Sequence, residues 1–442
     1  MTRLVAGVDT STQSCKVVIL DAADGRIVRQ GSAAHPDGTE VDPHAWWEAL
    51  IEAAAAAGGL SDVAAIAVGG QQHGLVTLDE DGAVVRDALL WNDTRSADAA
   101  ADLVAELGAK TWAEACGSVP VASLTVAKVR WLAEHEAENF ARTAAICLPH
   151  DYLTWRLRGT GELTDLVTDR SDASGTGYLD LREDHYRYDL LAHAAHLSAA
   201  DAERIQLPAV LGPWEAAGVV TREVAQIGLR RGTLIGPGCG DNAGAALGLG
   251  LAPGEAAVSI GTSGVVSVVS DEPVSDPSGL VTGFKDATGR WLPLACTLNG
   301  ARILSSTAEL LGVDFDTFDE LALSVPDAGG LRLTPYFEGE RTPNLPHASA
   351  ALAGMRLSNW DRPHLARAAV AGLADLMAGA ARAVTECGVP VRAVRLIGGG
   401  ARSAAVRAVL PDILGVPVAF PEPAEYVARG AAAQAARVLS EA

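Results

Sequence analysis

Hydrophobic and polar residues alternate along the chain in patterns that predict strands and helices in turn. Apolar runs at residues 4–8, 16–20 and 26–32, separated by small polar turns, predict a β-hairpin start. Further strands are predicted at residues 63–68, 145–148, 256–260, 265–270 and 393–397, and helices at 42–57, 97–107, 125–136, 301–311, 365–387, 403–414 and 430–440. This alternation predicts an α/β protein built on sheets.

An apolar strand, a hydroxyl-rich turn and a returning strand occur twice. The first copy turns at residues 9–14 and the second at residues 261–264. The repetition predicts two similarly built halves, and 442 residues are too many for one hydrophobic core. Glycine and proline cluster at residues 248–254, so we predict domains at 1–248 and 249–442.

The composition narrows the possible partners. Hydrophobic residues make up 49% of the chain and charged residues 20%, which is typical of a globular protein. The formal net charge of −21 argues against a nucleic-acid partner, which needs clustered Lys and Arg, and against an anionic membrane surface. Small anionic ligands stay open, because backbone amides can hold them locally.

Cysteine usage and hydropathy indicate a compartment. The six cysteines are too widely spaced for a zinc-type pair, and a chain of this size needs no disulfide framework. The first residues lack the apolar run of a signal peptide, and no stretch reaches the roughly 18 uninterrupted apolar residues of a membrane span. We therefore expect a cytoplasmic protein.

Asp241 is the candidate catalytic residue. It follows a short apolar strand and a glycine-rich turn, and it opens an Ala/Gly-rich helix that ends near residue 249. A carboxylate at this place suits a general base, because a helix N-terminus favours the ionised form. The alternative is an Asp that only caps the helix.

Two turns are candidates for binding phosphate. Residues 9–16 and 261–264 expose backbone N–H groups and hydroxyl donors, which suit phosphate oxygens. Asp9 is suited to hold a hydrated magnesium ion, since Mg²⁺ favours one or two carboxylates plus phosphate oxygens. The alternative for both turns is an ordinary hairpin connection.

A third glycine-rich turn, at residues 397–403, follows a strand and opens a helix, as nucleotide-binding turns do. It is neither a complete Rossmann fingerprint nor a Walker A loop. The alternative is a plain strand-to-helix turn.

Two segments offer groups that suit a sugar. Gln72 and His73 follow a buried strand, and their amide and imidazole groups can hydrogen-bond to polyol hydroxyls. Trp91 adds an aromatic plate next to Asn, Asp and Arg at residues 92–95. The alternative for His73 is a histidine packed against a neighbouring domain.

Together these segments resemble the carbohydrate kinases related to glycerol kinase and gluconokinase, and most of all the xylulokinases. The resemblance covers residues 5–436 and includes SLTVAKVRWLAEH at 123–135, which matches a signature pattern of that family. A second signature is approached at 351–371. The chain departs from the family at Ala371, where an acid is usual, and at Ser11, where glycine is usual.

The resemblance implies two actin-like (ribonuclease H-like) ATPase domains flanking a deep catalytic cleft. Asp241 would be the general base, with an ordinary pKa sufficing, and Asp9 would bind Mg²⁺ through water. The other implied contacts are Thr12, Gln13, Ser14 and Lys16 along the phosphate path, Gly261 and Thr262 at the nucleotide phosphates, Gly399 and Ser403 beside the adenosine, and Gln72, His73, Trp91 and Asn242 at the sugar.

The implied reaction transfers the ATP γ-phosphoryl group to the terminal hydroxyl of a ketopentose, giving D-xylulose 5-phosphate. Gln72 and His73 are the xylulokinase-like pair, whereas glycerol kinases carry Arg-Glu there. We expect a sugar, ATP and Mg²⁺ as partners, with neither nucleic acid nor membrane, and leave a homodimer open.

Two alternatives stay open. One is a kinase of ribulose, gluconate, glycerol or a related polyol. The other is an actin-like ATPase that switches conformation without phosphorylating a sugar, against which the candidate sugar-binding segments argue.

Overall fold

The computed structural model describes residues 3–441, which form two compact units. Unit 1 contains the chain up to Gly250, the segment Gly283–Trp291 and the chain from Glu425 onward, and unit 2 contains Leu251–Thr282 and Leu292–Ala424. The first crossing between units falls inside the predicted boundary region. The segment Gly283–Trp291 and the chain from Glu425 onward nevertheless belong to unit 1. Unit 1 is therefore not one continuous stretch of chain, as a single division at residue 248 would make it.

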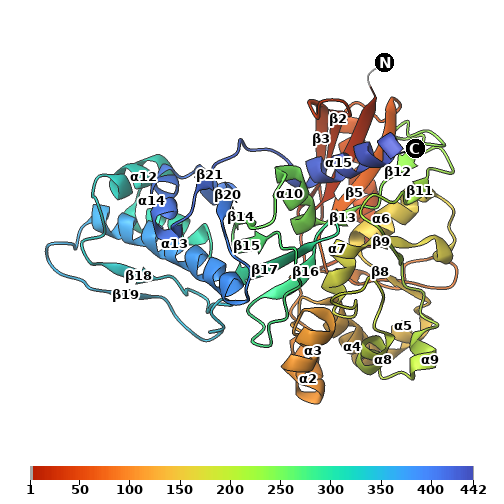
Figure 1. Ribbon diagram of the computed structural model, residues 1–442, viewed down its shortest axis with the longest axis horizontal. Coiled ribbons are helices and arrows are strands. Elements are labelled where there is room, and N and C mark those ends of the chain that lie inside the picture. The colour runs from red at the N-terminus through yellow and green to blue at the C-terminus, as the bar shows by residue number, and fades with distance from the viewer. Residues whose placement is uncertain (1–2, 442) are drawn as a thin grey trace. The chain divides into compact units, whose positions relative to one another are not determined.

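Unit 1 is built on a twisted mixed sheet in the order β11-β12-β5-β1-β2-β3 (Figure 1). These strands are β1 (Leu4–Thr10), β2 (Ser14–Asp21), β3 (Ile27–Ala34), β5 (Val63–Gly70), β11 (Gly218–Val219) and β12 (Leu234–Ile235). β1 pairs antiparallel with β2 and parallel with β5, and the short β13 (Cys239–Gly240) extends the end of β5. The ends of β5 and β13 therefore lie side by side.

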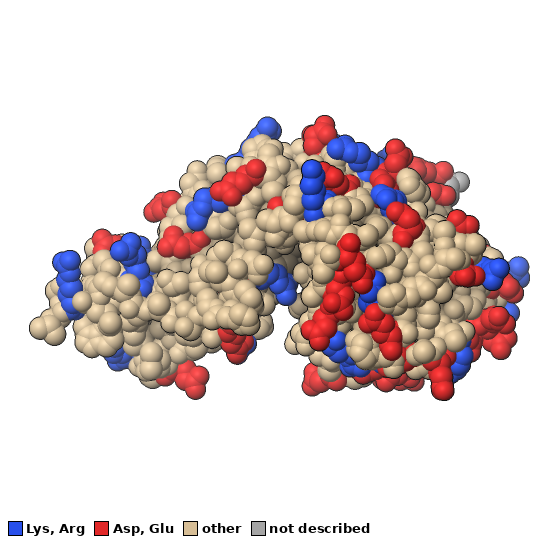
Figure 2. Space-filling view, turned by 90° about the horizontal axis from the view of Figure 1, so that it is seen from below, with Lys and Arg blue, Asp and Glu red and all other residues tan. Residues whose placement is uncertain are grey.

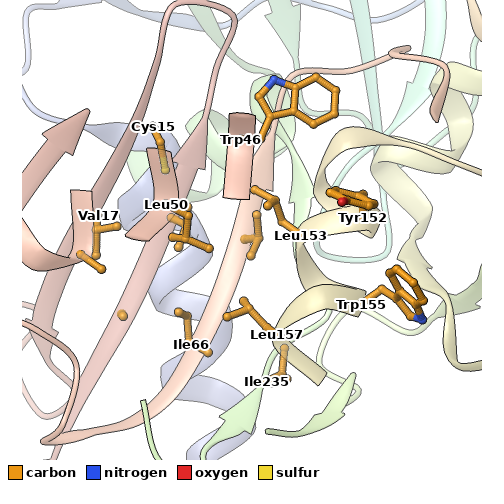
Figure 3. Close-up of a cluster of buried hydrophobic side chains, with 14 of the residues drawn as sticks. Cys15, Val17, Trp46, Leu50, Ile66, Tyr152, Leu153, Trp155, Leu157 and Ile235 are labelled. Atoms are coloured by element: carbon orange, nitrogen blue, oxygen red, sulfur yellow. The ribbon is translucent and has the colours of Figure 1, made fainter. Parts of the chain in front are cut away.

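One face of this sheet packs against α1 (Pro43–Ala56) and α6 (Pro149–Arg158). Figure 3 shows Leu50 of α1, Leu153 and Leu157 of α6 and Ile66 of the sheet in one cluster of buried apolar side chains. Pro at the first turn and Asp42 as N-cap begin α1 where the polar loop ends.

The other face of the sheet is covered by α15 (Tyr426–Glu441). Small side chains such as Ala428 and Ala432 pack there on Val5 and Val18. The approach is so close that a Cβ added to Gly7 would lie 1.8 Å from the carbonyl oxygen of Ala428. The sheet is thus a central layer between helices from opposite ends of the chain.

The remaining helices and strands of unit 1 surround the ends of this sheet. They are β4 (Glu40–Val41), β6 (Val76–Leu78), β7 (Ala88–Leu89), α2 (Ala97–Leu107), α3 (Ala109–Cys116), α4 (Thr125–His135), α5 (Ala137–Arg142), β8 (Ala145–Cys147), β9 (Val167–Asp169), α7 (Arg170–Ala173), α8 (Tyr188–Ala195), α9 (Ala199–Ala202), β10 (Ala209–Leu211) and α10 (Asp241–Leu249). Acidic side chains gather over unit 1 on the face shown in Figure 2, in keeping with the net charge.

Unit 2 repeats the central topology. Its strands β14 (Glu255–Ile260), β15 (Gly264–Val268), β16 (Thr282–Lys285), β17 (Trp291–Thr297), β20 (Ala393–Ile397) and β21 (Val418–Ala419) follow the order β16-β17-β15-β14-β20-β21. β14 pairs antiparallel with β15 and parallel with β20, as β1 does with β2 and β5. The two halves are thus built alike, as the sequence repetition predicts.

The helices of unit 2 pack on this sheet and on one another. They are α11 (Arg302–Leu311), α12 (Phe315–Leu323), α13 (Arg362–Glu386) and α14 (Ala404–Leu414), and a hairpin of β18 (Arg332–Thr334) and β19 (Ala351–Ala353) lies beside α13. α13 is long and apolar enough to cross a membrane, but 72% of its most apolar window is buried inside the protein. Its apolarity is that of a core helix. Ala371 lines a cavity of about 400 Å³ along α13.

Candidate active site

Asp241 is the first residue of α10, at the edge where β5 and β13 end together. The N-cap residue is Gly240, so the alternative that Asp241 caps the helix is wrong. Its Oδ1 accepts hydrogen bonds from the backbone N–H and the side-chain amide of Asn242, at 2.7 and 2.8 Å. Burial and then the charge of Asp9 raise the pKa of Asp241 to about 7, against the bonds from Asn242. The pKa of Asp241 therefore lies above the ordinary value that would suffice for a base in this reaction.

Gln72 lies directly beside this carboxylate. Its Oε1 accepts from Asn242 Nδ2 at 3.3 Å, and its Nε2 donates to the Ser171 carbonyl at 3.3 Å. The side chain is buried, and a Cβ on Gly240 would lie 2.7 Å from its Nε2. Gln72, Asn242 and Asp241 therefore form one hydrogen-bonded row.

His73 continues this edge in a strained backbone conformation. Its φ of +70° is uncommon for a residue with a Cβ. Its Nδ1 lies 2.8 Å from the Gly175 carbonyl oxygen, so Nδ1 carries the proton, and its own carbonyl accepts from Thr125 Oγ1 at 3.2 Å. The ring and the backbone of His73 are thus both fixed.

Asp9 occupies the end of β1 opposite Lys16 on β2. Lys16 Nζ lies 3.8 Å from Asp9 Oδ2 and 2.7 Å from Glu425 Oε2. Asp9 is 4% exposed and its Oδ1 has no hydrogen-bond partner. Burial raises the pKa of Asp9 to about 7, with Lys16 opposing and Glu425 adding to the rise. A buried carboxylate with an unused oxygen fits a water-coordinated divalent cation.

The turn after β1 is tied to the second candidate sugar segment. Trp91 Nε1 donates to Thr12 Oγ1 at 2.8 Å, so the indole N–H is already engaged. Ser11, the departure from the family glycine, closes the turn through its Oγ to the Ser14 carbonyl at 3.1 Å. Gln13 is exposed. Trp91 can therefore contact a sugar through the face of its ring but not through its N–H.

A buried charged cluster supports the row, and sequence analysis missed it. His150 Nδ1 lies 2.6 Å from Asp172 Oδ2 and 3.1 Å from Asp151 Oδ1. Although burial lowers it, these carboxylates raise the pKa of His150 to about 10. Burial raises the pKa values of Asp151 and Asp172. His150 is therefore protonated at neutral pH and supplies the positive charge of this cluster.

The same cluster reaches the candidate site through α7. Ser171 Oγ accepts from the Gly240 N–H at 3.1 Å, and the Ser171 carbonyl holds Gln72. Asp169 caps α7 by accepting from the N–H groups of Ser171 and Asp172. The sequence feature that could have identified this segment is its run of Ser, Thr, Asp and Gly after a short strand.

The predicted nucleotide residues lie in unit 2, where the parallel strands β14 and β20 end. Gly261 accepts from the Ala301 N–H at 2.7 Å, and Thr262 is exposed. Gly399 is exposed in a short 3₁₀ helix, Gly399–Arg402. Ser403 caps α14 through Val406 N–H at 3.1 Å and donates to Asp319 at 2.6 Å. The carboxyl ends of such strands are the usual place for ligands.

A half-buried carboxylate beside amide and imidazole side chains, together with glycine- and hydroxyl-rich turns at strand ends, is the arrangement expected of a phosphotransferase of the actin-like ATPase class. The sequence matches the FGGY family of carbohydrate kinases, over residues 4–248 for its N-terminal domain and 256–439 for its C-terminal domain. The chain belongs to this family.

Individual relatives agree with the family. The chain is 47% identical to a xylulose kinase of Streptomyces coelicolor over 99% of this chain and 88% of that one, and 35% identical to a xylulose kinase of Escherichia coli over 92% and 84%. The crystal structure of xylulose kinase from Bifidobacterium adolescentis matches with a TM-score of 0.93 at 50% identity, covering 100% of this chain and 94% of that one.

These findings confirm the predicted family and the fold of two actin-like ATPase domains. They make the protein an ATP-dependent carbohydrate kinase, with ATP as co-substrate. The roles of individual site residues stay predictions.

Proposed function

We propose that this protein transfers the γ-phosphoryl group of ATP to the terminal hydroxyl of D-xylulose, giving D-xylulose 5-phosphate and ADP. The observation that carries the proposal is the row in which Asn242 joins the Asp241 carboxylate to the Gln72 amide. Relatives named xylulose kinase, matched over nearly the whole chain, support this choice of sugar.

In this reaction Asp241 accepts the proton of the sugar hydroxyl as the new O–P bond forms and the bond to ADP breaks. A base with a pKa near 7 is matched to neutral pH. Gln72 and His73 hold neighbouring hydroxyls, and the ring of Trp91 packs on the sugar. Positioning and charge neutralisation supply most of the catalysis in such transfers.

Asp9 would hold Mg²⁺, which when bound neutralises charge on the phosphate oxygens. Lys16 and the turn with Thr12, Gln13 and Ser14 would line the phosphate path. The contacts proposed in unit 2 are Gly261 and Thr262 at the phosphates and Gly399 and Ser403 beside the adenosine. We place the reaction in the cytoplasm, where xylose metabolism would use its product, and leave a homodimer open.

A panel of acceptors tests the proposal in a coupled assay of ADP release. D-xylulose should give the highest kcat/KM, above D-ribulose, gluconate and glycerol. The variant Asp241→Asn should lose sugar-dependent ADP release for every acceptor. A higher kcat/KM for another acceptor would overturn the proposed substrate, and ATP turnover indifferent to sugar would overturn the kinase assignment of this site.

A further inference from the structure

The segment Gly283–Trp291 packs in unit 1, although the chain on either side of it belongs to unit 2. Its backbone is anchored twice: Gly283 N–H donates to the Gly117 carbonyl at 2.7 Å, and Lys285 N–H donates to Ser174 Oγ at 3.0 Å. At its far end the Trp291 indole donates to the Leu181 carbonyl at 3.1 Å. The segment is therefore fixed along its whole length.

A buried lysine adds to this anchoring. The side chain of Lys285 is 1% exposed, and its Nζ bonds to Asp184 Oδ1 and to the Glu183 carbonyl, each at 2.6 Å. Arg170 reaches the same carboxylate at 3.2 Å and donates to the Arg290 carbonyl at 2.8 Å. Burying a lysine is costly unless it is paired. The pairing of Lys285 therefore means that side chains, as well as the backbone, hold this segment to unit 1.

The anchored segment places one aromatic ring against the candidate sugar site. Phe284 is 5% exposed, and its ring centroid lies 5.5 Å from that of His73, with the planes tilted by 42°. The Gly175 carbonyl holds one edge of the imidazole through Nδ1, and Phe284 packs against the ring. A Cβ on Gly175 would lie 2.5 Å from His73 Nδ1, so no room is left for the ring to shift that way.

We infer that Phe284 is a positioning residue for the acceptor site: it holds the His73 imidazole in the one orientation that recognises a hydroxyl of the ketose. This inference rests on the proposed function. A site built to bond a particular hydroxyl rejects sugars that lack it in that place, provided that the bonding group is held rigidly. The segment 283–291 is thereby a specificity element supplied from beyond the first half of the chain.

The test measures sugar selectivity in Phe284→Leu and the milder Phe284→Met. Each should raise KM for D-xylulose by about tenfold or more, since small misplacement of a binding group is costly. The preference for D-xylulose over its epimer D-ribulose should fall, while KM for ATP stays within about twofold. Phe315→Leu is the matched control, because it is the same kind of substitution at an exposed ring of α12, outside the segment 283–291, and its sugar KM should be unchanged.

A double-mutant cycle with His73→Ala makes the inference specific, with thermal melting confirming that each variant is folded. In the His73→Ala background, Phe284→Leu should add little to sugar KM. Additive effects, or an unchanged sugar KM in both folded Phe284 variants while His73→Ala raises it, would overturn the inference and leave the proposed function standing. An unchanged sugar KM in His73→Ala would contradict both the inference about Phe284 and the proposed role of His73 in binding the sugar.

Discussion

Asn242 donates twice to the same oxygen of Asp241, once from its backbone and once from its side chain. The second oxygen of the carboxylate is therefore the one left to meet a substrate hydroxyl. We predict that Asp241→Asn, which keeps the shape, lowers kcat about 10²- to 10⁴-fold. Single-turnover kinetics would measure the loss, with ADP affinity as the control. A variant with nearly full kcat would exclude Asp241 as the base.

The charge of Asp9 contributes to the raised pKa of Asp241. Removing a like charge lowers a carboxyl pKa, so Asp9→Asn should move the titration of Asp241 from about 7 toward its ordinary range. A ¹³C NMR titration of the metal-free protein would follow both carboxyls without relying on activity. An Asp241 pKa unchanged by the substitution would show that the two groups do not interact.

The buried cation of His150 is expected to hold the carboxylates beneath the active site together. Replacing it in His150→Gln leaves Asp151 and Asp172 unpaired, which should cost about 3–5 kcal/mol of unfolding free energy. Chemical denaturation would measure this. His135→Gln is the control, because that exposed ring stacks on Trp131 and its Nδ1 bonds to the Trp131 carbonyl at 3.0 Å without any charged partner among the described residues, and its unfolding free energy should stay within about 0.5 kcal/mol of the parent.

The same histidine makes stability depend on pH. Its folded pKa of about 10 lies above the ordinary value of 6.5, so its contribution is complete below about pH 6.5 and is lost as pH rises through 10. Unfolding free energy measured from pH 6 to 10 should therefore fall more steeply in the parent protein than in His150→Gln. Equal slopes would mean that His150 is not the titrating group.

The contact between α15 and the sheet is predicted to tolerate no side chain at Gly7. Gly7→Ala places a methyl group 1.8 Å from the Ala428 carbonyl oxygen, and relieving this overlap should cost about 1–3 kcal/mol or more. Gly379→Ala in α13 is the matched control. A Cβ there meets nothing nearer than 3.7 Å, so the change should be neutral or stabilising by about 0.5–1 kcal/mol. Thermal melting separates the two cases.

The features that sequence predicts well are those that depend on neighbours in the chain. The strand at Ala393–Ile397 and the helix at Ala97–Leu107 coincide with the expected ranges, because apolar periodicity and flanking glycine fix them locally. The sequence singles out Asp241 and Gln72 as candidates for the same reason, since each lies just beyond the end of a buried strand. The final helix begins at Tyr426 rather than near residue 430 because its first turn packs on α10.

The features that sequence missed depend on segments far apart. Phe284 is one apolar residue among many until its segment docks beside His73. His150 reads as a scattered histidine until Asp151 and Asp172 surround it. The bond from the Ser403 hydroxyl to Asp319 also joins residues far apart, while the place of Ser403 beside adenosine stays a prediction. No local pattern encodes the contact of Phe284 with His73 or that of His150 with Asp172.

The covering of the unit 1 sheet by α15 has a consequence for synthesis of the protein. Val5 and Val18 leave the ribosome early, yet the helix that shields them is made only after all of unit 2. Until then this sheet face is bare and open to chaperones or to premature association. The half that carries Asp241 is thus the first to be translated and the last to be finished.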